Sequence, residues 1–225
     1  MLRYRLVIVA ILMSCAAGQL TWAAGSSSSG NAGVLPTTPA QSPEQQAQRA
    51  LKQGIRHRDR ALKYEQKAAD ASSDKRRDKA LKRVVKEWQK AIAKQRDALR
   101  HDPRSYQAAN ELGYALRKTG EFNKALGAYN YALEINPDFH QAVEYRAEAL
   151  LALGQYKAVQ EAYMALFRND RPLADQLMLA MDRWLVDSRV AELSDPEASF
   201  ASWVEQRQKM AAMTQSLSSH PSRAW

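Results

Sequence analysis

Residues that commonly carry catalytic or metal chemistry are present in this sequence, but their spacing does not assemble a site. The four histidines are His57, His101, His140 and His220, and none lies three or four residues from another histidine or a cysteine on a shared helix face. The sequence contains no Gly-x-Ser-x-Gly, no glycine-rich phosphate loop and no His-Glu-x-x-His. We therefore predict no catalytic site, no metal, no cofactor and no small-molecule substrate, and we expect a binding protein rather than an enzyme.

The first residues follow the order of a secretory signal. Two arginines precede an unbroken apolar run at residues 6–13, and small residues lead to a cleavage point after Ala23. The apolar run is shorter than the roughly 20 residues that a transmembrane helix needs. We predict a signal peptide at 1–23 and a flexible Gly/Ser/Pro linker at 24–43, whose composition offers almost nothing that could pack.

The only cysteine, Cys15, leaves a second kind of export open. The stretch Leu12-Met13-Ser14-Cys15 resembles the lipobox of bacterial lipoproteins, whose cysteine becomes the lipidated N-terminus. In that alternative the chain is a lipoprotein anchored through Cys15. Cleavage after Ala23 gives instead a periplasmic protein without cysteine. Both alternatives place the folded part outside the cytoplasm.

Positive charge is concentrated in one half of the chain. Residues 44–104 hold 19 Lys and Arg against 9 Asp and Glu, whereas residues 105–225 hold 12 against 15. The pattern of residues 44–104 predicts an irregular basic helical hairpin with a turn at 71–73 and a second helix that begins near Asp74. Its basic surface is either an ordinary solvated face or a contact for an anionic envelope surface or another polyanion.

The sequence repeats with a period of 34 residues. A shift by this number places Gly120 on Gly154 and Tyr129 on Tyr163, and residues of the same class coincide at other positions. Within each unit the apolar residues follow helical spacing. A glycine permits the chain reversal after the first helix, and Pro137 ends the second. Each unit is therefore predicted to be a pair of antiparallel helices.

The repeat resembles the tetratricopeptide repeat, whose pattern combines Leu-Gly, Ala-x3-aromatic and a closing proline. The matching residues are Ala109, Leu112, Gly113, Leu116, Ala125, Tyr129 and Pro137, with Gly120, Gly154, Tyr156 and Tyr163 as further structural positions. The resemblance implies an all-α fold, an α-solenoid of helix hairpins, with repeats at 105–138 and 139–171. We predict capping helices at 172–214, whose tryptophans Trp184 and Trp203 pack in the core, and a disordered tail at 215–225.

Two glycines interrupt segments that otherwise favour helix, at a cost of about 1 kcal/mol each against alanine. We expect Gly113 to face the partner helix near Ala125, where a side chain would push the two backbones apart. Gly127 either occupies a second crowded contact or is a tolerated surface glycine.

In the family that the repeat resembles, the first helix of each pair lines a concave groove that holds an extended peptide or a partner helix. The residues expected to face such a groove are Gln107, Asn110, Tyr114, Arg117, Gln141, Glu144, Tyr145 and Glu148. Amide side chains can both donate to and accept from a peptide backbone, and tyrosines offer flat apolar area. The carboxylates argue against a clamp for a C-terminal carboxylate. The alternative is that these are ordinary solvated polar side chains.

Taken together, these features predict an exported bacterial tetratricopeptide-type protein that acts as a protein-binding scaffold of the cell envelope. Its expected partner is another protein, bound as a peptide segment or a helix. The alternative function is binding of a polyanion or a membrane surface through the basic residues 49–104. Nucleic acid is not expected as a partner, because of the export signal and the scarcity of aromatic residues among the basic ones.

Overall fold

In the computed structural model, the described residues are 42–187 and 194–218, and they form eight helices and no strand. The helices are α1 (Pro43–Ala69), α2 (Asp74–His101), α3 (Tyr106–Lys118), α4 (Phe122–Ile135), α5 (His140–Ala152), α6 (Tyr156–Asn169), α7 (Arg171–Asp187) and α8 (Asp195–Ser218). The predicted all-α fold of helix hairpins is thus confirmed. The predicted signal peptide, most of the linker and Cys15 lie outside the described residues.

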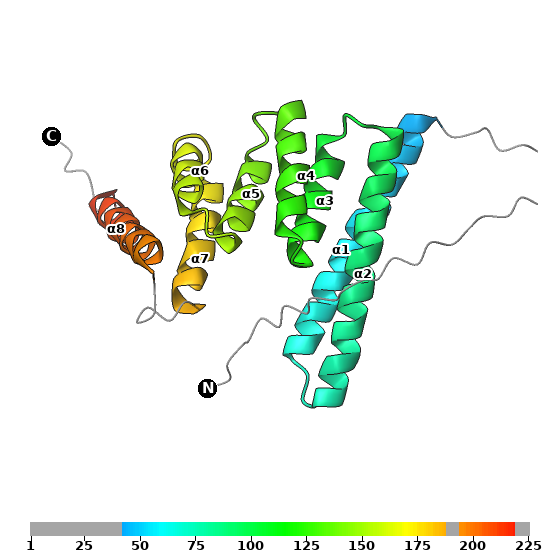
Figure 1. Ribbon diagram of the computed structural model, residues 1–225, viewed down its shortest axis with the longest axis horizontal. Helices are drawn as coiled ribbons and strands as arrows, with labels where there is room; N and C mark the ends of the chain where they lie inside the picture. Colours follow the sequence, from blue (N-terminus) through cyan, green and yellow to red (C-terminus); the bar gives the residue numbers. More distant parts are fainter. Residues whose placement is uncertain (1–41, 188–193, 219–225) are drawn as a thin grey trace, which may run out of the picture. The chain divides into compact units, whose positions relative to one another are not determined.

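The first six helices pair as antiparallel hairpins, α1–α2, α3–α4 and α5–α6, and each hairpin contacts the next (Figure 1). The last two helices pack onto this array, α7 against α5 and α6, and α8 against α6 and α7. The helices α3 to α6 have 13 or 14 residues, whereas α1 and α2 have 27 and 28. At 1.5 Å per residue, α2 is about 40 Å long and α3 about 20 Å. The α1–α2 hairpin therefore projects well beyond α3 (Figure 1). As predicted, its second helix begins at Asp74 after a short turn.

The tight turns within the two central hairpins are built alike, 34 residues apart. Gly120 and Gly154 have φ values of 80° and 70°, which L side chains rarely adopt. In the first turn the amide of Glu121 donates to the carbonyl of Leu116 at 2.9 Å, and in the second Gln155 donates to Leu150 at the same distance. These bonds satisfy carbonyls left open at the helix ends. The 34-residue period of the sequence is therefore also seen in the backbone conformation and hydrogen bonds of the two turns.

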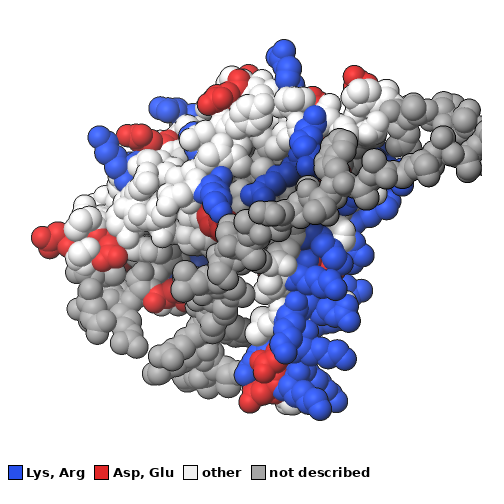
Figure 2. Space-filling model, turned by 45° about the vertical axis from the view of Figure 1, so that its right-hand side comes forward, with Lys and Arg blue, Asp and Glu red and all other residues white. Residues whose placement is uncertain are grey.

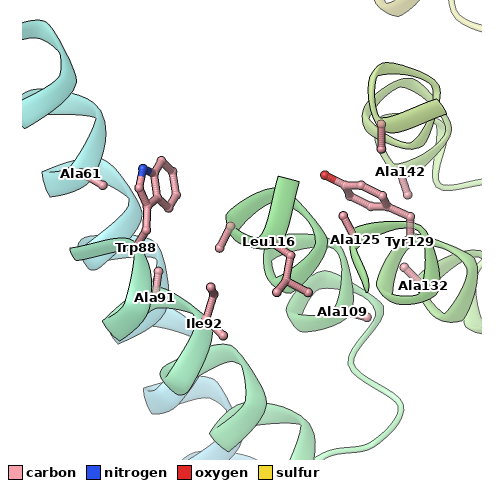
Figure 3. Packing of buried hydrophobic residues seen from close by; sticks show 12 residues of the cluster. Ala61, Trp88, Ala91, Ile92, Ala109, Leu116, Ala125, Tyr129, Ala132 and Ala142 are labelled. Carbon is pink, nitrogen blue, oxygen red and sulfur yellow. The ribbon is translucent and has the colours of Figure 1, made fainter. Parts of the chain in front are cut away.

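Two large apolar clusters hold the hairpins together, one from α1 to α5 and one from α5 to α8, and a small cluster around Ala98 joins α1, α2 and α3. Figure 3 shows part of the first cluster, where Trp88 of α2 and Tyr129 of α4 are the largest buried side chains. In the second cluster Trp184 and Trp203 pack against Phe200 with ring centroids 5.2 and 6.1 Å away. Their predicted role in core packing is confirmed. The compact unit Pro43–Trp225 contains both large clusters and all eight helices, so we expect it to fold on its own.

The two glycines within helices, Gly113 and Gly127, have different surroundings in the structure. A Cβ atom at Gly113 would lie 2.6 Å from Cε1 of Tyr129, which is far inside van der Waals contact. Gly113 therefore faces α4, as predicted, with the Tyr129 ring as its neighbour. A Cβ at Gly127 would meet nothing within 4 Å. Of the two alternatives for Gly127, the surface position is the correct one.

The last helix begins at Asp195 and runs past the predicted end of the capping helices. At its start, the amide and hydroxyl of Ser194 both donate to Glu197 Oε2, at 2.9 and 2.7 Å. The bond from the Ser194 amide is the glutamate half of a capping box, with serine and glutamate three residues apart. The helix then continues to Ser218, past the predicted boundary at 214, because no Gly or Pro stops it before that point. Residues 219–225 lie outside the described part.

No helix in the described residues is both long and apolar enough to cross a bilayer. Within the same residues, no three His, Cys, Asp or Glu side chains gather in a way that could hold a metal ion.

Candidate functional site

The eight residues predicted to face a groove lie on α3 and α5, the first helices of the two central hairpins. We call this set the α3–α5 face; its members are Gln107, Asn110, Tyr114, Arg117, Gln141, Glu144, Tyr145 and Glu148. Spacings of three, four and three residues along α3 place its four members on one stripe of the helix. On α5 the spacings are three, one and three residues, which also keeps the four members on one side of the helix. The two sets are brought side by side where the hairpins stack.

Two tyrosines form the centre of this face. The rings of Tyr114 and Tyr145 lie 5.0 Å apart and are tilted by 56°, a favourable geometry for an aromatic pair. The Arg117 guanidinium lies 5.2 Å from the Tyr114 ring and 5.6 Å from the Tyr145 ring. Trp88 of α2 extends the cluster, with its centroid 5.8 Å from that of Tyr114. Two helices therefore place tyrosines around one arginine, and the buried Trp88 supports them from a third helix.

Arg117 forms an ion pair with Glu148, which joins α3 to α5 beside the tyrosines. Glu144 lies one turn from Glu148 and is only 2 % exposed. Burial, and secondarily the charge of Glu148, raise the pKa of Glu144 to about 8, while Arg117 opposes the shift. At neutral pH Glu144 is therefore largely protonated and can donate its proton toward Glu148, the partner of Arg117.

The titration of Glu144 predicts a pH-dependent stability. The folded protein keeps a proton on this carboxyl between its ordinary pKa of 4.5 and about 8, and the unfolded chain releases it. Because the folded state binds more protons in this window, the free energy of unfolding falls as pH rises. We expect Glu144→Gln, which keeps the shape and a donor toward Glu148, to flatten this profile and to stabilise the protein at pH 8 by about 1 to 3 kcal/mol. Urea unfolding between pH 5 and 8 measures the effect, and parallel profiles for parent and variant would contradict it.

The remaining members of the face differ in exposure. Gln107 is exposed, and so is Gln141, whose Nε2 donates to the Tyr145 hydroxyl at 3.2 Å. Asn110 is 2 % exposed, and its Oδ1 has no hydrogen-bond partner among the described residues. Asn110 and Glu144 are therefore not ordinary solvated side chains. Their predicted role in binding a partner stays a prediction.

A row of ion pairs between α1 and α3 borders the face, and the sequence did not predict it. Arg58 pairs with Glu111 at 2.5 Å, and Lys118 pairs with Glu65 at 2.8 Å. Glu65 also accepts a hydrogen bond from Trp88 Nε1 at 2.9 Å. The paired charges lie 53 residues apart in the chain, so no local pattern could have indicated them.

These pairs determine the electrostatic character of the face. Arg117 within the face, and Arg58 and Lys118 beside it, are each already bonded to a carboxylate. A bound carboxylate would have to compete with those partners, at a desolvation cost. The face therefore favours aromatic contact and amide hydrogen bonds over capture of a charged group.

Comparison with known protein families identifies a repeat in one of the hairpins, α3–α4. Residues 106–139, which cover α3 and α4, match the family model of the tetratricopeptide repeat. A search of curated proteins gives no match. Among solved structures, the chain is similar to the TPR2B-domain:pHsp70 complex of yeast Sti1, with 18 % identity, a TM-score of 0.42, and coverage of 59 % of this chain and 98 % of that one. Tetratricopeptide domains are generally non-catalytic scaffolds that bind other proteins or peptides. This chain thus resembles the tetratricopeptide family through a matched repeat, α3 and α4, set in an all-α array of helix hairpins.

Proposed function

We propose that the protein is a non-enzymatic scaffold of the bacterial cell envelope and that it binds a partner protein, as a peptide segment or a helix, on the α3–α5 face. The observation that carries this proposal is the aromatic centre formed by Tyr114 and Tyr145 around Arg117. A tyrosine ring offers apolar area with little conformational entropy to lose, which is why tyrosine and arginine are enriched at protein interfaces.

The polar members of the face supply complementary hydrogen bonds. Asn110 is 2 % exposed, so it lies beneath the surface that a partner would contact and supports that surface from below. Gln107 and Gln141 are exposed and can donate to and accept from a peptide backbone. A mainly neutral segment with apolar side chains fits this surface, because the cations beside it are already paired.

The envelope setting rests on the first residues of the sequence. The charged start, the apolar run at 6–13 and the small residues before Ala23 support export to the periplasm, and Cys15 supports anchoring as a lipoprotein as the alternative. In either case the linker at 24–43 would tether the helical unit.

A matched pair of variants tests the binding face. Gln107→Arg/Gln141→Arg adds two large charged side chains at exposed positions of the face, and Asn123→Arg/Asn169→Arg adds the same charge at exposed positions of α4 and α6. All three tagged proteins are used in pull-downs from native cell envelopes, after circular dichroism has checked their folds. We expect the parent and the control to capture the same protein in similar amounts. The face variant should capture at least about tenfold less of it, because burying unpaired charge at an interface costs more than about 1.4 kcal/mol. Equal capture by both variants would contradict the proposal.

A further inference from the structure

The projecting end of the α1–α2 hairpin carries a hollow of about 500 Å³ that is separate from the α3–α5 face. Its lining includes Lys67 of α1 and Arg76, Lys79 and Arg83 of α2, with Asp70 as the one acidic residue. Figure 2 shows Lys and Arg side chains gathered over this hairpin. Residues 60–86 hold ten Lys and Arg against four Asp and Glu, a net charge of +6.

In the described part of the chain, some cations of the hairpin are paired with carboxylates, but those of the hollow are not. Nearer to α3, Arg58 pairs with Glu111, and both Arg60 and Lys90 pair with Glu87. Within the described residues, none of the four cations of the hollow has a carboxylate within ion-pair distance. The hollow therefore concentrates positive charge that the fold leaves uncompensated.

The neighbouring groups leave this charge available. Both oxygens of Asp70 accept hydrogen bonds from Gln66 Nε2, at 3.0 and 2.9 Å, which turns the one carboxylate toward α1. The Arg76 guanidinium donates to the Ser72 hydroxyl at 3.1 Å and keeps further N–H groups. The Lys67 ammonium lies 5.4 Å from the ring centroid of Tyr64, a lining residue whose hydroxyl is a further donor.

We propose that this hollow binds a phosphate-bearing anion. Four cations and one carboxylate give the lining a formal charge of +3, which a phosphate group of about −1.5 to −2 or a pair of such groups offsets far better than a single carboxylate does. The planar guanidinium groups of Arg76 and Arg83 match phosphate oxygens through two parallel N–H bonds, and lysines add compact charge. The anion is either a soluble phosphate compound or a lipid headgroup, and both sources present the same chemistry to the hollow.

Two variants with equal charge change test the proposal in the unit 43–225. Lys79→Gln/Arg83→Gln removes two cations from the hollow, and Lys82→Gln/Lys86→Gln removes two exposed cations from the same helix that do not line it. The probes are inorganic pyrophosphate, followed by titration calorimetry, and vesicles of phosphatidylcholine and phosphatidylglycerol in equal amounts, followed by co-sedimentation. We expect the hollow variant to bind at least about tenfold more weakly, because it loses charge-assisted hydrogen bonds, and the control to stay within about threefold of the parent.

Each outcome decides the proposal. Binding of pyrophosphate with this difference between the variants supports the hollow as a site for a soluble phosphate compound. Binding of the vesicles alone, with the same difference, supports it as a headgroup site. No binding of either probe overturns the proposal, and so does an equal loss in both variants, because equal losses would mean that the hairpin attracts anions through its overall field only.

Discussion

Replacing Gly113 by alanine is expected to lower the free energy of unfolding by about 2 kcal/mol, although alanine is the better helix former. The added Cβ would lie 2.6 and 2.7 Å from Cε1 and Cδ1 of Tyr129. That ring is fully buried in the first cluster and has no room to retreat, so α3 and α4 would have to separate. The loss of packing outweighs a gain of about 1 kcal/mol in helix propensity.

Gly127→Ala is the matched control, since it makes the same chemical change on the partner helix. The new methyl group would meet nothing within 4 Å, so only the propensity gain remains. We expect this variant to be more stable than the parent by about 0.5 to 1 kcal/mol. Urea unfolding followed by circular dichroism measures both. If Gly113→Ala proved as stable as Gly127→Ala, the close approach of α3 to α4 would not depend on the glycine.

Trp88→Ala is expected to lower the free energy of unfolding by about 4 kcal/mol, a larger loss than that of Gly113→Ala. The indole is 1 % exposed, packs 5.8 Å from Tyr114 and donates a hydrogen bond to Glu65. Alanine would leave a cavity between the α1–α2 hairpin and α3 and would remove a partner of a carboxylate. Because Trp88 supports Tyr114, the variant should also weaken binding at the α3–α5 face.

Leu81→Ala provides the control for the loss of an apolar side chain from the same helix. Leu81 is 46 % exposed, so its truncation should change the free energy of unfolding by about 0.5 kcal/mol or less. Thermal and urea unfolding of the two variants give the comparison. A Trp88→Ala protein that unfolds like Leu81→Ala would show that the basic hairpin and the repeats are not joined through this side chain.

The hairpins were predictable because their signals are local. A period of 34, a glycine after each first helix and a proline after the second mark turns that need no knowledge of distant contacts. The clearest example is Gly120, whose positive φ recurs at Gly154. The helix α8 shows the limit of such signals: it continues to Ser218, past the predicted end at 214, because no Gly or Pro marks its end in the sequence.

The clustering of the aromatic residues on the α3–α5 face could be predicted from the sequence, but the burial and ion pairing of the face could not. Helical spacing on α3 and α5 brings Tyr114, Arg117 and Tyr145 together, as the structure confirms. Whether a polar residue on such a stripe is buried depends on the neighbouring hairpin, so the sequence could not show that Asn110 and Glu144 are covered. The ion pairs between α1 and α3 likewise depend on how the long α1–α2 hairpin packs against α3. Because that hairpin does not follow the 34-residue repeat, the repeat pattern could not predict this packing.

The most direct test of the central claim is site-specific photo-crosslinking in native cells. A photoreactive amino acid replaces Gln107 or Gln141 on the α3–α5 face, and Asn123 or Glu134 on α4 as exposed controls, which leaves the core untouched. We expect the two face positions to cross-link to one and the same protein, and the two control positions not to do so. Cross-links to that protein from α4 alone, or equally from all four positions, would contradict the α3–α5 face as the binding surface.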